Sequence, residues 1–484
     1  MKVPALIICL FFIAWMLRSD IKRRRTLSWA VWIPTVYLLI VGSRPLSEWL
    51  GLGHPWNGNG LVNDSEGSPV DQVFFFSFLV GSLVLATARG VQWGKFFAAN
   101  APLMLFYLYF VASICWSEDP TGSFKRLFKD FGMLFIVAVI LSEKDPFEAM
   151  RAVYVRCACV LFPLSAVFIK WYPEYARSFS PEGTPMYTGV TMQKNTLGEI
   201  VLCFSAFMIW DYLESLQGKF RWSRVPWDRV LLLVMGVWLL HMCQSKTSLV
   251  CLMMATALML RKGWFSSKLV SRVVLFGALS LPYLVFFAQK FSDVIAPVVQ
   301  ALGRNMTFTG RTDIWNHIDL TTVNPLIGFG YYNFWGGSGG ARVNEAMQMM
   351  IPNAHDGYVD LYLDGGLIGL AILFSMLIAY GNRFIKTLER DGFQKLRFAM
   401  LIAAIIYNLS ESNWARISTI WFTTLLVLSY VPSIKPVWRR RAVEGVAFDH
   451  DRTPAAAEAA ELEVPCPVET VARMKQFSRL SLSR

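Results

Sequence analysis

Apolar segments of about 15–25 residues recur along this chain and are separated by shorter polar loops, and a run of that length can cross the hydrocarbon core of a bilayer as an α-helix. Hydrophobic residues make up 55% of the 484 residues and charged residues 17%. A water-soluble globular protein does not have that balance. The sequence therefore predicts an all-α polytopic integral membrane protein.

The apolar runs predict about 12–13 transmembrane helices. Loops rich in Lys and Arg, among them RSDIKRRR, SEKDPFEAMR and RKGWFSSKLVSR, fall on one side if the helices alternate in direction. The positive-inside rule makes that side the cytoplasm, with the N-terminus outside and the C-terminus inside. The runs cover residues 3–17, 27–43, 72–88, 97–115, 127–142, 152–170, 197–213, 229–243, 248–260, 273–289, 364–382, 398–410 and 417–432.

The long loops on the opposite side set the predicted domain organisation. We expect N-terminal membrane helices and an outer loop in residues 1–69, a membrane domain in 70–432 and a disordered cytoplasmic tail in 433–484. The longest outer loop covers residues 290–363. A loop of that length is too long for a simple connector, and long ordered loops usually carry function.

Several cations on the outer side act against the positive-inside rule. Lys194 begins an apolar run in TMQKNTLGE, Lys246 lies at the tip of a short hairpin in HMCQSKTSLV, and Arg311 lies in TFTGRTDIWNHI. An anionic ligand would explain these charges, and phosphate is the natural one because Arg binds it with two parallel hydrogen bonds and Lys acts as a point charge. The alternative is that each is a snorkelling or hairpin-tip cation.

A histidine and three carboxylates stand just before a late apolar run. His355 is placed for proton transfer near neutral pH, and the alternative is an interfacial polar residue. Asp356, Asp360 and Asp364 follow at four-residue steps and would share one helix face, where they could orient His355 or pair with cations. No second histidine has metal-ligand spacing, so we expect neither a metal nor a cofactor.

The segment NPLIGFGYYNFW (324–335) combines aromatic residues with glycines between Arg311 and His355. Aromatic rings stack on sugars and also lie at membrane interfaces. A wall of a substrate cavity and an interfacial anchor are therefore both open for this segment.

These motifs, in this order, resemble the O-antigen ligase and O-antigen polymerase superfamily, which includes exopolysaccharide polymerases. The late elements are GRTDIW (310–315), NPLIGFG (324–330) and HDGYVDLYLDGGLIGL (355–370). The earlier elements are WSEDPTGSFKR (116–126), QKNTLGE (193–199) and QSKTSL (244–249). The resemblance covers residues 70–430 approximately.

The resemblance implies a GT-C-like glycosyltransferase of the bacterial inner membrane that acts on the periplasmic side without a nucleotide sugar. By carry-over, Arg311 and Lys246 contact the pyrophosphate of an undecaprenyl-pyrophosphate-linked oligosaccharide, and His355 activates the acceptor hydroxyl. Ligases of the family often carry Arg at the hairpin tip, so Lys246 favours the exopolysaccharide polymerases. The further residues expected to bind substrate are Lys194, Asn195, Arg126, Asp356, Asp360, Gly328, Gly330 and Trp315.

Polymerisation of lipid-linked repeat units is the function expected first, by a metal-independent displacement that inverts the sugar carbon. The alternative is a ligase that transfers a finished glycan to lipid A-core or another acceptor. A transporter of lipid-linked glycans is a more distant alternative, because the sequence has no evident inverted repeat. The expected partners are the lipid-linked oligosaccharide and the bilayer, with a chain-length regulator as a further candidate and no nucleic acid.

Overall fold

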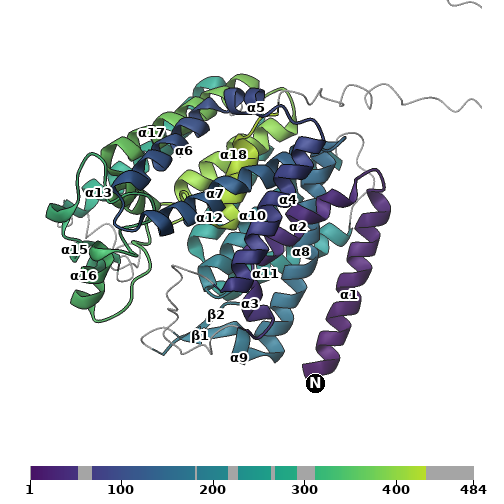
Figure 1. Cartoon of the computed structure of the whole chain (residues 1–484). Coiled ribbons are helices and arrows are strands. Elements are labelled where there is room, and N and C mark those ends of the chain that lie inside the picture. The colour runs from purple at the N-terminus through teal and green to yellow at the C-terminus, as the bar shows by residue number, and fades with distance from the viewer. Residues whose placement is uncertain are drawn as a thin grey trace, which may run out of the picture. The chain divides into compact units, whose positions relative to one another are not determined.

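The computed structural model describes residues 2–52, 68–179, 183–215, 227–262, 267–290 and 311–431 (Figure 1). These residues are mainly helical, with one antiparallel pair of strands, β1 (Arg177–Phe179) and β2 (Pro185–Tyr187). The helices are α1 (Lys2–Arg23), α2 (Trp32–Val41), α3 (Leu46–Trp49), α4 (Pro69–Ala88), α5 (Trp93–Ala99), α6 (Ala101–Ser113), α7 (Pro120–Leu141), α8 (Pro146–Trp171), α9 (Pro173–Ala176), α10 (Lys194–Ser215), α11 (Trp227–Cys243), α12 (Lys246–Leu260), α13 (Lys268–Lys290), α15 (Arg311–Asn316), α16 (Ser338–Met347), α17 (Gly357–Thr387), α18 (Gly392–Tyr407) and α19 (Thr419–Leu428), with 3₁₀ turns η1 (Trp29–Val31), η2 (Ile114–Trp116) and η6 (Leu320–Thr322).

Every apolar run found in the sequence lies largely in helical residues, which confirms the predicted all-α polytopic class. Within the described residues, five helices are long and apolar enough to cross a membrane, namely α1, α4, α8, α10 and α17. The number rises to six if a bent pair is counted as one span. The predicted total of 12–13 crossings stays a prediction. The predicted tail at 433–484 and the part of the outer loop at 291–310 lie outside the described residues.

The run 97–115, predicted as one span, is instead a bent pair. Helix α5 and the segment Ala101–Trp116 meet at 97°. Asn100 stands at the corner, where its side-chain amide donates to the carbonyls of Phe96 (2.8 Å) and Tyr430 (2.9 Å), and Pro102 follows at the start of α6. Because a proline suits the first turn of a helix but not its interior, the chain begins a new helix there.

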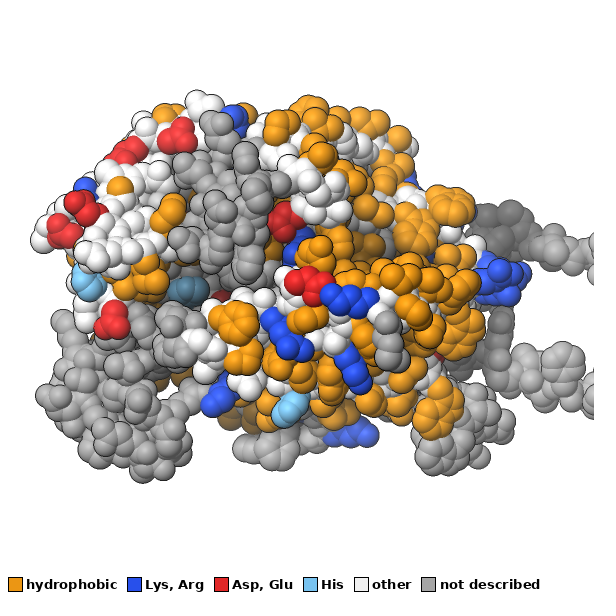
Figure 2. All heavy atoms as spheres, turned by 90° about the horizontal axis from the view of Figure 1, so that it is seen from below, with side chains coloured by type: hydrophobic (Ala, Val, Ile, Leu, Met, Phe, Trp, Pro, Cys, Tyr) orange, Lys and Arg blue, Asp and Glu red, His pale blue; other side chains and the backbone are white. Residues whose placement is uncertain are grey.

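The most buried helices lie at the centre and the apolar outer helices face outward. All ten residues of α19 are buried, whereas Phe11 and Trp15 of α1 and Val73 and Phe76 of α4 are exposed. Figure 2 shows apolar side chains over much of the surface seen from below, with Lys and Arg side chains gathered near the middle of that face. Lipid, not water, is the solvent that accommodates an apolar surface of this extent.

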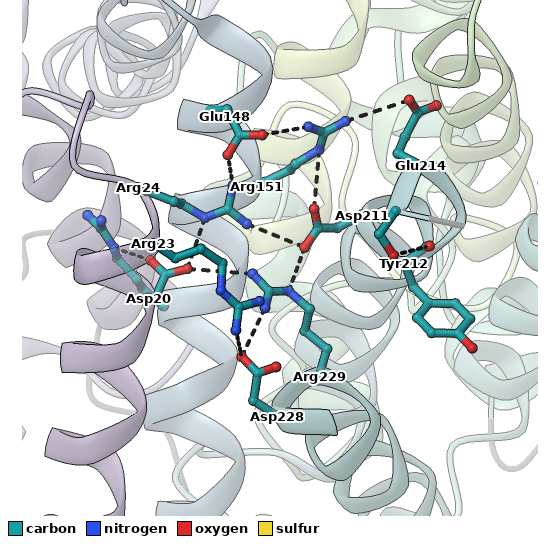
Figure 3. Close-up of polar contacts among 12 residues, drawn as sticks. Asp20, Arg23, Arg24, Glu148, Arg151, Asp211, Tyr212, Glu214, Asp228 and Arg229 are labelled. Carbon is teal, nitrogen blue, oxygen red and sulfur yellow. Dashed lines mark hydrogen bonds and ion pairs between the residues drawn. The ribbon is translucent and has the colours of Figure 1, made fainter. Parts of the chain in front are cut away.

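A buried ion network joins the ends of α1, α8, α10 and α11 (Figure 3). Asp20 accepts from Arg24 (2.9 Å) and Arg156 (2.9 Å), and Arg229 bonds Asp211 (2.5 Å) and Asp228 (2.9 Å). The Asp20, Arg24, Arg156 and Arg229 side chains are each at most 4% exposed. Buried charges persist when each has partners of opposite sign, as these have.

The same network tests one part of the predicted topology. It brings together the end of α1, the start of α8, the end of α10 and the start of α11. The Arg24–Glu148 ion pair thus confirms that the predicted loops RSDIKRRR and SEKDPFEAMR lie at the same end, while residues 216–226 between α10 and α11 lie outside the described residues. Which compartment that end faces stays a prediction.

Helix α17 is broken at Gly366, and the NPLIGFG segment is inserted at the break. Gly366 has φ 60° and ψ −163°, a backbone conformation that is open essentially only to glycine. The carbonyls of Leu363 and Asp364, which helical bonds would satisfy, instead accept from the N–H groups of Phe329 and Gly330, both at 2.9 Å.

The two backbone donors freed by the break are satisfied by the same segment. Leu367 N–H donates to the Pro325 carbonyl (2.9 Å) and Ile368 N–H to the Leu326 carbonyl (3.1 Å). The approach is so close that a Cβ on Gly366 would lie 2.3 Å from the Leu326 carbonyl group. The segment therefore replaces the lost helical bonds, which a broken helix in a membrane protein must recover.

We predict that Gly366→Ala prevents this packing, because the added Cβ meets the Leu326 backbone and the conformation at Gly366 is unfavourable for alanine. The expected loss is at least about 3 kcal/mol of folding free energy. Thermal unfolding of the purified protein in detergent measures it. Gly81→Ala on α4, where a Cβ meets nothing within 4 Å, is the control. Equal melting temperatures for the two variants would contradict the role of the break.

Candidate functional site

Three residues predicted to contact substrate gather around one partly buried glutamate. Glu411 lies in the loop between α18 and α19, and its Oε1 accepts from Asn195 Nδ2 (2.7 Å) and from Arg311 Nη2 (3.3 Å). Lys194 is close enough to act electrostatically on the same carboxyl group. The side chains of Arg311 and Glu411 are 18% and 13% exposed. We call Lys194, Asn195, Arg311 and Glu411 the Glu411 cluster.

The hairpin tip that carries Lys246 reaches the same loop. The Thr247 and Ser410 hydroxyl groups share a hydrogen bond of 2.7 Å. Thr247 follows Lys246 in the chain and Ser410 precedes Glu411, so this bond brings the hairpin tip to the loop that carries Glu411. Gly198, in the first turns of α10, lies against Ser245 and Ser248, so α10 and α12 begin side by side. Helix N-termini attract anions, and here the first residue of each helix is a lysine.

The backbone around His355 is held in a conformation that few histidines adopt. His355 has φ 52°, and its N–H donates to Asn353 Oδ1 (3.0 Å). The preceding residue, Ala354, donates its N–H to Asp360 Oδ1 (2.9 Å) and accepts from Trp315 Nε1 (2.8 Å). These bonds hold the turn between α16 and α17 and tie it to α15, and strain of this kind is typical of functional positions.

The surroundings of His355 favour its neutral form. Burial lowers the pKa of His355 below its ordinary value of 6.5, the charge of Arg311 lowers it further, and Asp360 acts in the opposite direction. A neutral imidazole can accept a proton, whereas an imidazolium cannot. Arg311 and a neutral imidazole therefore lie within electrostatic reach of each other.

The predicted stripe of aspartates is confirmed for Asp360 and Asp364, which share one face of α17, whereas Asp356 precedes the helix as its N-cap. Asp356 caps the helix by accepting from the N–H groups of Tyr358 (2.8 Å) and Val359 (3.1 Å). Asp360 and Asp364, both buried, face Arg416, whose guanidinium is 2.9 Å from Asp364 and 3.8 Å from Asp360. Burial alone would lower the pKa of Arg416, but Asp364 raises it above its ordinary value.

Arg126 belongs to this second group of charges and not to the Glu411 cluster. Its guanidinium donates to the Tyr332 carbonyl (3.1 Å) and lies 5.1 Å from the Tyr332 ring centre. Arg416 lies over the same ring at 3.5 Å. Tyr332 also has a positive φ, 53°. We call Arg126, Tyr332, Asp360, Asp364 and Arg416 the Arg416 cluster.

Local packing explains why glycine stands at the two positions predicted to bind substrate, Gly328 and Gly330. Gly328 (φ 65°) packs on the Asp364 backbone and Gly330 (φ 94°) packs on Ser113 and Ser117. The proposed cavity wall and the substrate-binding roles of Gly328, Gly330, Trp315, Asp356 and Asp360 stay predictions. Among the described residues, no three His, Cys, Asp or Glu side chains gather in a way that could hold a metal ion.

Sequence reasoning singled out neither Glu411 nor Arg416 as a site residue. Both lie in NLSESNWAR (408–416), a polar loop between two apolar runs. Glu411 is the one acidic residue in that loop, which is a signal that the sequence does contain. What the sequence does not contain is the fold that brings this loop to Arg311 and Asn195, which lie 100 and 216 positions away.

We predict that Arg416→Ala strongly destabilises the protein, because Asp364 and Asp360 then remain buried without their cation. Removing one partner of a buried pair costs roughly 3–5 kcal/mol. Thermal unfolding in detergent measures the loss. Arg342→Ala is the matched control, since Arg342 is exposed and bonds the Thr322 hydroxyl. An unchanged melting temperature for Arg416→Ala would show that the aspartates do not depend on this cation.

Two comparisons with known proteins bear on this site. Residues 231–374 match the family model described as O-antigen ligase, a segment that contains Lys246, Arg311 and His355 but not Glu411 or Arg416. Over 310 residues the chain is 24% identical to the exopolysaccharide production protein ExoQ of Rhizobium meliloti (strain 1021), across 61% of this chain and 68% of that relative. These likenesses confirm the predicted resemblance to the O-antigen ligase and polymerase family and support a membrane enzyme of polysaccharide synthesis.

Proposed function

We propose that this protein is an inner-membrane glycosyltransferase that joins oligosaccharide repeat units carried on undecaprenyl pyrophosphate, at the periplasmic face. The observation that carries the proposal is the Glu411 cluster, in which Arg311 is hydrogen-bonded to Glu411 and lies within electrostatic reach of His355. An arginine suits the diphosphate of the donor, and a neutral histidine suits the hydroxyl of the acceptor.

The reaction requires one bond to form and one to break at the donor sugar. The acceptor hydroxyl oxygen attacks the anomeric carbon, and the bond from that carbon to the pyrophosphate oxygen breaks. His355 takes the hydroxyl proton, and the carrier leaves as undecaprenyl pyrophosphate. Arg311, Lys246 and Lys194 stabilise the charge that develops on the leaving oxygen, the kind of electrostatic assistance that preorganised cations provide. Direct displacement inverts the configuration of that carbon.

The second candidate function is ligation of a finished glycan to lipid A-core or another acceptor. It uses the same donor chemistry and differs in the acceptor. The likeness to an exopolysaccharide production protein favours polymerisation. Lipid-linked glycan transport is less favoured, because a transporter has no need of the proton acceptor beside the arginine.

The size of the lipid-linked glycan in a strain that lacks this protein tests the proposal. We expect single repeat units on the carrier and no long polymer, because the joining step is absent. Extraction of the carrier lipid and sizing of its sugar chain measure this. Long chains held on the carrier would indicate ligation instead, and a normal profile would contradict both functions.

We predict that Arg311→Ala and His355→Ala each reduce polymer by at least about 100-fold in that strain, the usual loss when a general base or its electrostatic partner is removed. Lys246→Arg keeps substantial activity because the charge remains. Matched controls are His317→Ala and Arg342→Ala, whose side chains are exposed. Immunoblots of membranes check that all variants are present. Full activity of His355→Ala would disprove its role as the base.

A further inference from the structure

A carboxylate in the middle of a predicted pyrophosphate site needs an explanation. Glu411 Oε1 holds Asn195 at 2.7 Å and Arg311 at 3.3 Å, so it occupies one direction in which the Arg311 guanidinium could bind a phosphate. A negative charge there competes with an anionic ligand for the same cation. The charge also limits the affinity of the site, unless it is removed when the ligand binds.

The groups that face Glu411 come from several elements. Arg311 approaches from α15, Lys194 and Asn195 from the start of α10, Glu199 from further along α10, and Tyr407 from α18. Burial raises the pKa of Glu411 to about 8, Arg311 and Lys194 lower it, and Glu199 raises it. Glu411 therefore changes charge close to physiological pH, and added negative charge nearby shifts it further toward the neutral form.

We propose that Glu411 is a positioning residue that holds Arg311 and Asn195 while the site is empty, and that its ionised form must take a proton from solvent and release Arg311 before the diphosphate of the donor can bind. This inference rests on the proposed function. It assigns the site a proton-coupled exchange in which one anion, the carboxylate, is replaced by another, the diphosphate. Asn195 remains bonded to the protonated carboxyl through its oxygen, so the helix start stays in place.

The sign of the pH effect follows from this exchange. At pH 7 Glu411 is mostly protonated and competes little, so the diphosphate reaches Arg311 freely. Above pH 8 the carboxylate must take up a proton before the diphosphate binds, and the affinity falls by up to about tenfold for each further pH unit. The Glu411→Gln side chain keeps an oxygen that can accept a hydrogen bond from Asn195 but carries no charge. The affinity of this variant for the diphosphate should therefore not fall in this way above pH 8.

The test is binding of inorganic pyrophosphate to the purified full-length protein in detergent, measured by calorimetry at pH 7 and pH 9. We expect wild type and Glu411→Gln to bind about equally at pH 7, and the wild type to bind about tenfold more weakly than the variant at pH 9. Because pyrophosphate itself titrates, the variant supplies the reference. Glu174→Gln, which changes an exposed glutamate paired with Lys2, should behave as wild type.

Two results separate the failure of this inference from failure of the proposed function. If binding requires Arg311 but the pyrophosphate affinities of wild type and Glu411→Gln change equally from pH 7 to pH 9, the exchange is wrong while the proposed donor site is still supported. If Arg311→Ala binds pyrophosphate as well as wild type, the donor site itself is wrong.

A second measurement serves if Glu411→Gln does not fold. Calorimetry of the wild type with inorganic sulfate, which does not itself titrate near pH 8.5, in two buffers of different ionisation enthalpy counts the protons exchanged on binding at that pH. Net proton uptake is expected, because a carboxylate becomes a carboxyl group. No exchange, or net release, would contradict the exchange between the two anions.

Discussion

The insertion of NPLIGFG into the break of α17 is the interaction on which the rest of this site depends. Backbone hydrogen bonds from Phe329, Gly330, Leu367 and Ile368 replace those that the helix loses at Gly366. The break lets the first part of α17 carry Asp360 and Asp364 in the protein interior. Since Asp360 in turn holds the backbone before His355, a local irregularity in one helix sets the position of the predicted base.

The distribution of buried charge distinguishes the two ends of the molecule. At one end, Asp20, Arg24, Arg156 and Arg229 form a network in which each charge has partners of opposite sign, and its evident effect is to join α1, α8, α10 and α11. At the other, Arg311 bonds Glu411 and Lys194 acts electrostatically on the same carboxyl group, so two cations face one acidic side chain. The first arrangement suits structure, and the second suits binding.

The sequence predicted most residues of the candidate site but not all of them. Lys194, Lys246, Arg311 and His355 were identified because polar residues stand out between apolar runs, and the structure brings Lys194 and Arg311 to one cluster with His355 in electrostatic reach. Arg126 was grouped with them, although its contacts lie with Tyr332. Glu411 was missed because a single acidic residue in a polar loop belongs to no periodic pattern or motif. Its place in the site becomes evident only from its contacts with Asn195 and Arg311, which are far away in the chain.

What the sequence by itself determined was the class of protein and the order of its helices, because the length and apolar character of each run follow from the thickness of the membrane. It also determined the shared face of Asp360 and Asp364, since that face follows from helical periodicity alone. Only the tertiary structure decided the bend at Asn100, the break at Gly366 and the partners of Arg311 and Arg416. Each of these depends on hydrogen bonds between residues far apart in the chain, which local patterns cannot encode.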